Sequence, residues 1–346
     1  MHRAVIFLFS FFLLPFLLLF CLLDEWDAVR EAIDNAEHAR VIVIVANRLG
    51  VQLVHAKGRQ EIDEFMGVAS ASKIVAGSII MRLVEQGRLN LFGKASDYLD
   101  YWTTDPTDLR SNVTVQNLLS FTSGFRGEHP CLFRLGPTFS LQECARDIYD
   151  GDNMFGYAPD STFYYSSNHL QIAGAIAEVA SGLAWQDLFD AEFRRPLNLS
   201  QQTVFVGGTN PGLAFSLETS PEEYNTYFNA YYNYQYLSYE TTRLMEGDWT
   251  PTSAVTMAFQ PNNWGKHYGL VIVFSSFFPQ LCVCLFLTVA VYNKANWFEC
   301  LGAGDDAEEA EWREECLQED THASKGANGF FPVVDRFHDY YFVIGT

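Results

Sequence analysis

Several common features are missing from this 346-residue sequence, and each absence excludes a class of function. Lysine and arginine number 22 against 42 acidic residues, which gives a net charge of −20, and no basic run occurs. Because phosphate groups are bound by clustered basic side chains, a nucleic acid is not expected as a partner. No Cys-x-x-Cys pair is matched by a second cysteine or histidine pair, so a zinc site is not expected either. The sequence contains no internal repeat and indicates no cofactor.

Charged residues are also absent from the leader, residues 4–23, which is almost wholly apolar. Such a segment is typical of a secretory signal peptide (1–23), and its length of about 20 residues also suits an uncleaved membrane anchor. Both alternatives place the body of the chain, 24–346, outside the cytosol. In a eukaryotic host, Asn112 and Asn198 would then be glycosylation acceptors, because each begins an Asn-x-Ser/Thr triplet.

A second uncharged stretch, 271–292, lies within the body of the chain. A membrane span there would place the segments before and after it on opposite sides of the bilayer. We therefore interpret 271–295 as an anomalous insertion, such as a translated intron, with a membrane-facing hairpin as the alternative.

The seven cysteines include two local couples, Cys131/Cys144 and Cys300/Cys316. An oxidising compartment favours disulfides, so we expect each couple to close a loop.

Ser70 and Lys73 form the chain's one pair in which a lysine follows a serine by three positions. The apolar run that follows keeps helical spacing until Gly87. Residues three apart share one helix face, so the amine can reach the hydroxyl. A serine hydroxyl becomes a good nucleophile only when a neighbouring base takes its proton. We therefore predict that Lys73 is the base and Ser70 the nucleophile. A Ser-x-x-Lys match also arises by chance about once in a chain of this length, so other segments must support it.

Further segments follow this pair in a characteristic order. They are 83–91, 114–125, 163–170, 174–182 and 195–199. With Ser-x-x-Lys they resemble the serine β-lactamase-like family, in its branch of class C enzymes, D-alanyl-D-alanine peptidases and esterases. The resemblance covers about residues 40–346 apart from the insertion, and Leu-Leu-Ser-Phe-Thr-Ser-Gly at 118–124 is its most specific part.

The resemblance implies an α/β (α+β) β-lactamase/transpeptidase-like fold, with an antiparallel sheet from both termini, flanking helices and a mostly helical lobe. The sequence pattern agrees, because β-rich segments at 40–55 and 329–344 enclose helical ones. The segment 220–245, with seven tyrosines, is expected to pack as an aromatic lid or wall.

In this family the second motif is Tyr-x-Asn, whose tyrosine lies beside the nucleophile. The match here is Tyr165-Ser166-Ser167, with Ser167 in place of the usual asparagine. Read one residue later, Ser166-Ser167-Asn168 matches the Ser-x-Asn version of other branches. We favour Tyr165 as the functional residue, because a tyrosinate near Lys73 is a credible base.

The third motif is matched loosely by His322-Ala323-Ser324-Lys325-Gly326, and the alternative is a surface turn. The resemblance implies that His322 or Lys325 faces the site and that Gly326 leaves room for the substrate. The N–H of Ser70 and one from the strand near Ala327 would form the oxyanion hole.

These assignments predict a secreted or anchored serine hydrolase that acts on an ester, amide or small peptide. A deacylating glutamate of the class A type cannot be placed by motif, which makes true lactamase activity the weaker hypothesis. One alternative is a catalytically silent binding or scaffold protein, since Ser167 and the third motif depart from the family pattern. Another is a membrane protein with two spans, 4–23 and 271–292. The expected partner is a small-molecule or peptide substrate, with membrane association through 4–23.

Overall fold

The computed structural model describes residues 26–134, 136–250, 256–259, 270, 273–274, 321–324, 326–336 and 339–346. The leader, the Cys300/Cys316 couple, Lys325 and most of 271–295 lie outside the described residues, and so do the two candidate membrane spans except for 273–274. Within the described ranges, no helix is long and apolar enough to cross a bilayer.

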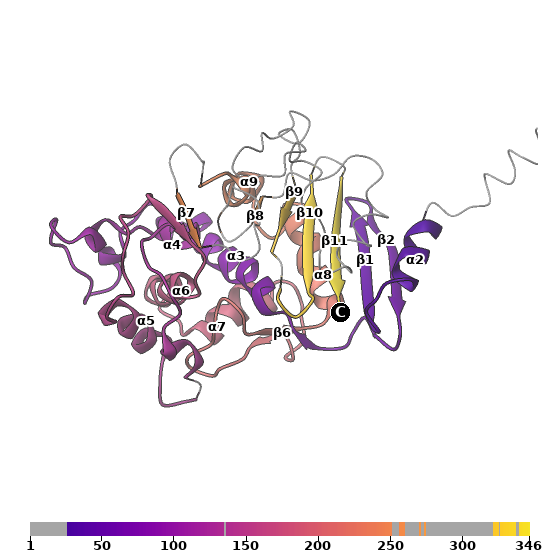
Figure 1. Ribbon diagram of the computed structural model, residues 1–346, viewed down its shortest axis with the longest axis horizontal. Coiled ribbons are helices and arrows are strands. Elements are labelled where there is room, and N and C mark those ends of the chain that lie inside the picture. The colour runs from indigo at the N-terminus through magenta and orange to yellow at the C-terminus, as the bar shows by residue number, and fades with distance from the viewer. Residues whose placement is uncertain are drawn as a thin grey trace, which may run out of the picture.

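Strands from the two ends of the chain form one six-stranded sheet in the order β2-β1-β11-β10-β9-β8 (Figure 1). The strands are β1 (Val41–Asn47), β2 (Gly50–Lys57), β8 (Val273–Phe274), β9 (Thr321–Ala323), β10 (Phe331–Asp335) and β11 (Tyr340–Gly345). All neighbouring strands run antiparallel. The predicted antiparallel sheet from both termini is therefore confirmed. The sheet also extends, through β8, into the beginning of the segment 271–295.

The two faces of the sheet are buried by different helices. Val41, Val43 and Val45 of β1 lie in the core formed with α2 (Asp27–Asp34), whereas Ile44 and Ala46 face the main core. Successive side chains of a strand alternate between faces, so a strand covered on both sides is apolar throughout. This explains the uninterrupted apolar run of β1.

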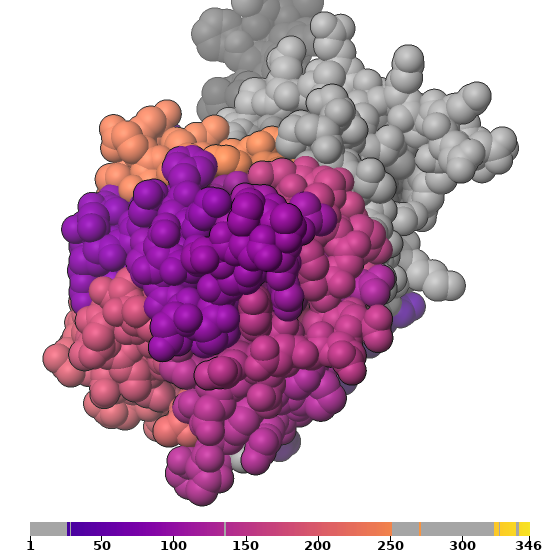
Figure 2. Space-filling model, turned by 90° about the vertical axis from the view of Figure 1, so that its left-hand side faces the viewer, coloured from indigo at the N-terminus to yellow at the C-terminus, as the bar shows by residue number. Residues whose placement is uncertain are grey.

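The mostly helical lobe lies beside the sheet, at the left of Figure 1, and α3 (Ser72–Glu85) runs between the two. Its other helices are α4 (Val115–Leu119), α5 (Leu141–Asp150), α6 (Asn168–Ser181) and α7 (Trp185–Phe189). Figure 2 shows the end of this lobe, where the purple residues between α3 and α4 cover its upper middle. Thr114 and Ser140 cap α4 and α5, and α6 ends at Gly182 with a φ of 69°.

The tyrosine-rich segment forms α8 (Pro221–Tyr232) and α9 (Tyr239–Glu246). Five of its seven tyrosines lie in the main core, whereas Tyr239 is exposed. The Tyr224 hydroxyl donates to Ala71 O (3.0 Å), and the Tyr227 hydroxyl lies 2.7 Å from Ser78 Oγ. Because α8 contacts β1 and β11 on its other side, it forms a buried aromatic wall that supports α3.

Short strands complete the fold around α3. β3 (Met66–Gly67), β6 (Leu217–Thr219) and β5 (Val204–Phe205) form a small sheet directly before the Ser70 turn. β4 (Thr162–Tyr164) pairs in parallel with β7 (Thr256–Phe259) and leads into the second motif.

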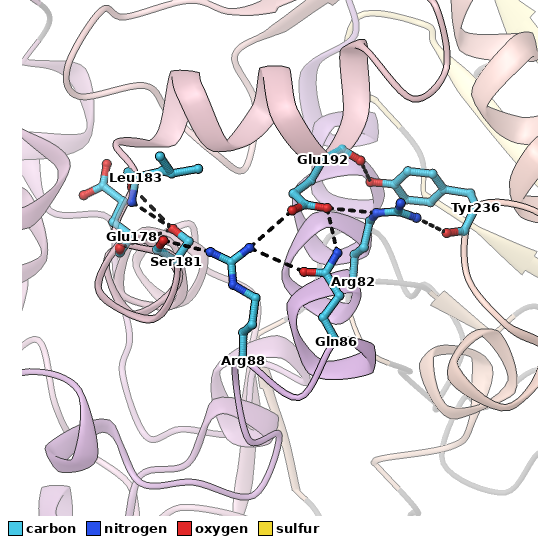
Figure 3. A network of polar contacts seen from close by, with 8 residues as sticks. All are labelled: Arg82, Gln86, Arg88, Glu178, Ser181, Leu183, Glu192 and Tyr236. Atoms are coloured by element: carbon cyan, nitrogen blue, oxygen red, sulfur yellow. Dashed lines mark hydrogen bonds and ion pairs between the residues drawn. The ribbon is translucent and has the colours of Figure 1, made fainter.

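A polar network joins the end of α3 to the lobe (Figure 3). The Glu192 carboxylate accepts hydrogen bonds from Arg82 Nε (3.0 Å), Gln86 Nε2 (2.8 Å) and Arg88 Nη1 (3.3 Å). The Glu192 carbonyl accepts a bond from the Tyr236 hydroxyl (2.9 Å). Glu192 lies in a π-helical turn, Asp190–Arg194, which directly follows α7.

One of the two predicted disulfides lies within the described residues and is confirmed. Cys131 and Cys144 are bonded, with their Cα atoms 5.3 Å apart, and they join the loop before α5 to that helix. This loop also carries Glu128, which lies at the candidate site.

Candidate active site

Ser70 lies in a 3₁₀ turn, Ala69–Ala71, at the start of α3. Ala69 adopts a φ of 47°, a left-handed conformation that costs free energy for a residue with a side chain. Ser72 stabilises the turn, because its hydroxyl donates to Ala69 O (2.6 Å) and accepts from the Leu217 N–H (3.0 Å). The small sheet thus holds the Ser70 side chain at the helix start, half-buried but accessible.

Lys73 is buried and points at Ser70. Its Nζ lies 2.9 Å from Ser70 Oγ and 2.8 Å from Ala214 O. The lysine stem is packed in the core, so the amine is held in one position rather than sampling solvent. A neutral amine at this distance is placed to accept the hydroxyl proton.

Tyr165 lies against the same amine: Lys73 Nζ is 4.7 Å from the centroid of its ring. Phe121 also contacts the Tyr165 ring, in an edge-to-face arrangement with centroids 5.6 Å apart. Phe121 itself is buried with a φ of 60°, which is rare for an aromatic residue. Strain of this kind is often concentrated at functional sites.

The alternative second-motif residue, Asn168, points into a loop. Its Nδ2 donates to the carbonyls of Arg126 and Gly127 (both 3.1 Å), and its Oδ1 accepts from the His129 N–H (3.0 Å). Asn168 is fully buried. These contacts give it a role in fixing the loop 126–129, and they favour Tyr165 as the residue next to the nucleophile.

Ser167 is half-buried at the start of α6, and its N–H donates to Glu128 Oε1 (2.8 Å). Glu128 was not predicted from the sequence. It lies four residues after the 118–124 motif, and no spacing distinguishes it from an ordinary surface glutamate. Partial desolvation by the surrounding protein raises the pKa of the Glu128 carboxyl, against the opposing effects of its hydrogen bonds to Ser167 and, more weakly, of the charge of Lys73.

The third motif approaches the Ser70 turn through Ser324 and Gly326. The Ser324 hydroxyl donates to Ser70 O (3.2 Å). A Cβ atom at Gly326 would lie 2.2 Å from Val68 O, so only glycine fits there. The neighbour that excludes a side chain at Gly326 is the Val68 backbone, so the predicted role of leaving room for the substrate stays a prediction. The contact of Ser324 was not predicted.

His322 is buried on β9, and its Nε2 lies 3.9 Å from Glu246 Oε2. Glu246 is itself buried and paired with Arg243 and Arg336. The structure thus places the predicted third-motif histidine against a buried ion-pair cluster. Lys325, its alternative, lies outside the described residues.

The Ser70 N–H is the first of the two predicted oxyanion-hole donors. Within the described part of the chain, no carbonyl accepts a bond from the Ser70 N–H. On the third-motif side, the Gly326 N–H donates to Phe330 O (2.7 Å), and Ala327 is exposed.

In the described residues, no group of three or more acidic, histidine or cysteine side chains is arranged to hold a metal.

Sequence comparison now identifies the family. The chain matches the Beta-lactamase family over residues 30–210, just over half of its length. The chain belongs to this family. The β-lactamase/transpeptidase-like fold expected from the motifs is thereby confirmed, as is the predicted relationship to penicillin-binding proteins.

Two curated relatives and one solved structure illustrate the similarity. Penicillin-binding protein 4 of Amycolatopsis lactamdurans is 30% identical over 141 residues, which cover 40% of this chain and 36% of that protein. D-alanyl-D-alanine-carboxypeptidase/endopeptidase AmpH of Escherichia coli (strain K12) is 26% identical over 146 residues, 42% of this chain and 38% of that protein. The match therefore spans little more than a third of each relative. The octameric penicillin-binding protein homologue from Pyrococcus abyssi has a TM-score of 0.63 at 14% identity, over 91% of this chain and 70% of that one.

Proposed function

We propose that the protein is a serine hydrolase that forms an acyl-enzyme at Ser70 from an ester, amide or small peptide substrate. The observation that carries this proposal is the 2.9 Å contact between Lys73 Nζ and Ser70 Oγ at the start of α3. It joins a nucleophile to a base in the geometry that activated serines require. Family membership and the names of the relatives support hydrolysis.

The reaction would proceed in two steps. Ser70 Oγ attacks the substrate carbonyl while its proton passes to neutral Lys73, and Tyr165, whose ring lies against the Lys73 amine, relays it towards the leaving group. The Ser70 N–H stabilises the oxyanion, and collapse of the tetrahedral intermediate expels the protonated leaving group. A water molecule then attacks the acyl-enzyme with the same groups acting as base, which releases the acid and restores Ser70.

The proposed location is outside the cytosol, on the basis of the apolar leader and the Cys131–Cys144 disulfide. Both glycosylation triplets begin on exposed asparagines, Asn112 and Asn198, as an extracytoplasmic glycoprotein requires. Association with a membrane would occur through residues 4–23.

The proposal is tested by hydrolysis of p-nitrophenyl esters and by labelling with a fluorophosphonate probe. Lys73→Ala should lower the acylation rate by about 10²- to 10⁴-fold, the usual contribution of a positioned base, and Tyr165→Phe should have a similar effect. Lys94→Ala, which removes an exposed surface lysine, is the matched control and should react like the wild type. Equal rates for Lys73→Ala and Lys94→Ala would rule out the proposed base.

A second function, binding without catalysis, is favoured by the position of His322. Its contact with Glu246 places it in a buried ion-pair cluster, which is a structural role. A silent member would fail to react with the probe while remaining folded, so the labelling experiment separates the two functions.

A further inference from the structure

The Lys73 amine has two close polar contacts, and one of them is a backbone carbonyl. Nζ lies 2.9 Å from Ser70 Oγ and 2.8 Å from Ala214 O. A neutral amine has two N–H bonds and one lone pair, and only the lone pair can accept the Ser70 proton. When Ala214 O accepts one N–H, rotation of the amine is restricted and its lone pair can stay directed at the hydroxyl. The position of this carbonyl therefore affects how well the nucleophile is activated.

Ala214 lies in a turn, 212–216, that presents its carbonyl to the amine. The turn is closed by hydrogen bonds from the N–H groups of Phe215 and Ser216 to Gly212 O (3.0 and 2.9 Å). After the turn the chain enters β6, which is held in the small sheet. Before the turn, no helix or strand is present back to β5. Other contacts must therefore hold this end of the turn in place.

Two fully buried amides, Gln171 of α6 and Asn210, provide these contacts. Gln171 Nε2 donates to Asn210 Oδ1 (2.8 Å) and to Pro211 O (3.0 Å), and its Oε1 accepts from the Leu213 N–H (3.4 Å). The Leu213 side chain also packs on α6, where a Cβ at Gly174 would lie 2.1 Å from it. The segment that leads into the turn is therefore attached to the helix that begins at the second motif.

Asn210 is anchored in turn on the loop that the Cys131–Cys144 disulfide joins to α5. Its Nδ2 donates to Cys131 O (2.8 Å) and to Arg134 O (3.1 Å). The N–H groups of both amides are thus used within the protein. Any other arrangement would leave buried polar groups without partners, which is costly, so such a network favours one geometry. The amide pair therefore sets α6, the disulfide loop and the turn relative to one another.

We propose that Gln171 and Asn210 are positioning residues for the reaction at Ser70, on which they act through the Ala214 carbonyl and the Lys73 amine. This inference rests on the proposed function. Both amides are fully buried, so neither can contact a substrate. Their loss should slow the chemical step without weakening binding, because a displacement of about 1 Å in a reacting group can cost about 10²-fold in rate.

The test measures fluorophosphonate labelling of the full-length protein at several probe concentrations. This separates the maximal rate of inactivation, kinact, from the probe concentration that gives half of it, KI. Gln171→Met removes three hydrogen bonds but keeps the length of the side chain, and should lower kinact by about 10- to 100-fold while KI changes by less than about twofold. Asn210→Ala should act in the same direction, and it decides the outcome if Gln171→Met does not fold.

Gln142→Met is the matched control. The Gln142 amide of α5 also donates to a backbone carbonyl and to a side-chain oxygen, Ala175 O and Glu178 Oε2 (both 2.8 Å). Its hydrogen bonds do not involve the segment before the turn. Gln142→Met should therefore lose stability in urea unfolding and keep the wild-type kinact.

A double-mutant cycle with Lys73→Ala distinguishes positioning from general structural damage. If the amides act through the Lys73 amine, adding Gln171→Met to Lys73→Ala should lower the residual labelling rate by less than about twofold. An equal loss in both backgrounds, an effect on KI alone, or a wild-type kinact in folded Gln171→Met would overturn the inference and leave the proposed function intact. A wild type that is not labelled, or Lys73→Ala that is labelled as fast as the wild type, would overturn both.

Discussion

Acid should destabilise this fold through one buried histidine, His169, in the first turn of α6. Its Nε2 lies 2.8 Å from Tyr164 O and its Nδ1 lies 2.8 Å from Ser123 Oγ. The neutral ring therefore donates to the carbonyl and accepts from the hydroxyl, while its face stacks on Phe121 at 4.9 Å. Complete burial lowers the pKa of His169 to about 3, and a helix N-terminus also disfavours positive charge.

The direction and size of the effect follow from proton linkage. The folded-state pKa lies below the unfolded value of about 6.5, so the contribution to stability is complete above pH 6.5 and is lost as the pH falls towards 3. The difference between the unfolded and folded pKa values corresponds to roughly 5 kcal/mol in the free energy of unfolding, at about 1.4 kcal/mol per pH unit. Between pH 7.5 and pH 5 the loss from this residue is about 2 kcal/mol.

Urea unfolding at several pH values between 7.5 and 5 measures this contribution. The wild type and Ser123→Ala should share the pH dependence, because Ser123→Ala removes a hydrogen bond but no titrating group. His169→Gln should be less stable at pH 7.5, yet its free energy of unfolding should fall by about 2 kcal/mol less on acidification. If His169→Gln loses as much stability as the wild type over this interval, the histidine is not the acid-sensitive group.

Three further variants test how the site is supported. Gly326→Ala places a Cβ 2.2 Å from Val68 O, so its fluorophosphonate labelling rate should fall at least about 10-fold, and a wild-type rate would contradict the close approach. Replacing both Cys131 and Cys144 by alanine should cost about 2–4 kcal/mol in urea unfolding under oxidising conditions, and an unchanged midpoint would exclude a stabilising disulfide. Glu192→Gln removes the charge shared by the arginines in Figure 3 and should lower the free energy of unfolding by about 1–3 kcal/mol, which a thermal scan showing no shift in Tm would refute.

Local patterns were sufficient to predict the elements on which the site is built. The spacing of Ser70 and Lys73 predicted their contact, because residues three apart on a helix always share a face. The β-rich segments at 40–55 and 329–344 predicted one sheet from both termini, and in the structure β1 pairs with β11. The π-helical turn that carries Glu192 is not revealed by hydrophobic periodicity alone.

The residues that were missed reach the site only through tertiary contacts. Glu128 stands in a loop whose position depends on the buried amide of Asn168, and no local spacing encodes that contact. Ser324 lies in a chain segment that meets the Ser70 turn from the other end of the sequence. His322 was predicted, and its contact with Glu246, set by the register of β9 against β10, could not be predicted from the motif; that it faces the site stays a prediction. Motif spacing contains none of this information.

The most direct test of the central claim is the identity of the residue that becomes acylated. The protein is incubated with a fluorophosphonate, its intact mass is measured, and the modified peptide is sequenced by tandem mass spectrometry. The account predicts a single adduct on Ser70, its absence in Ser70→Ala, and a normal adduct yield in Ser123→Ala. An adduct on another serine, or undiminished labelling of Ser70→Ala, would contradict the account.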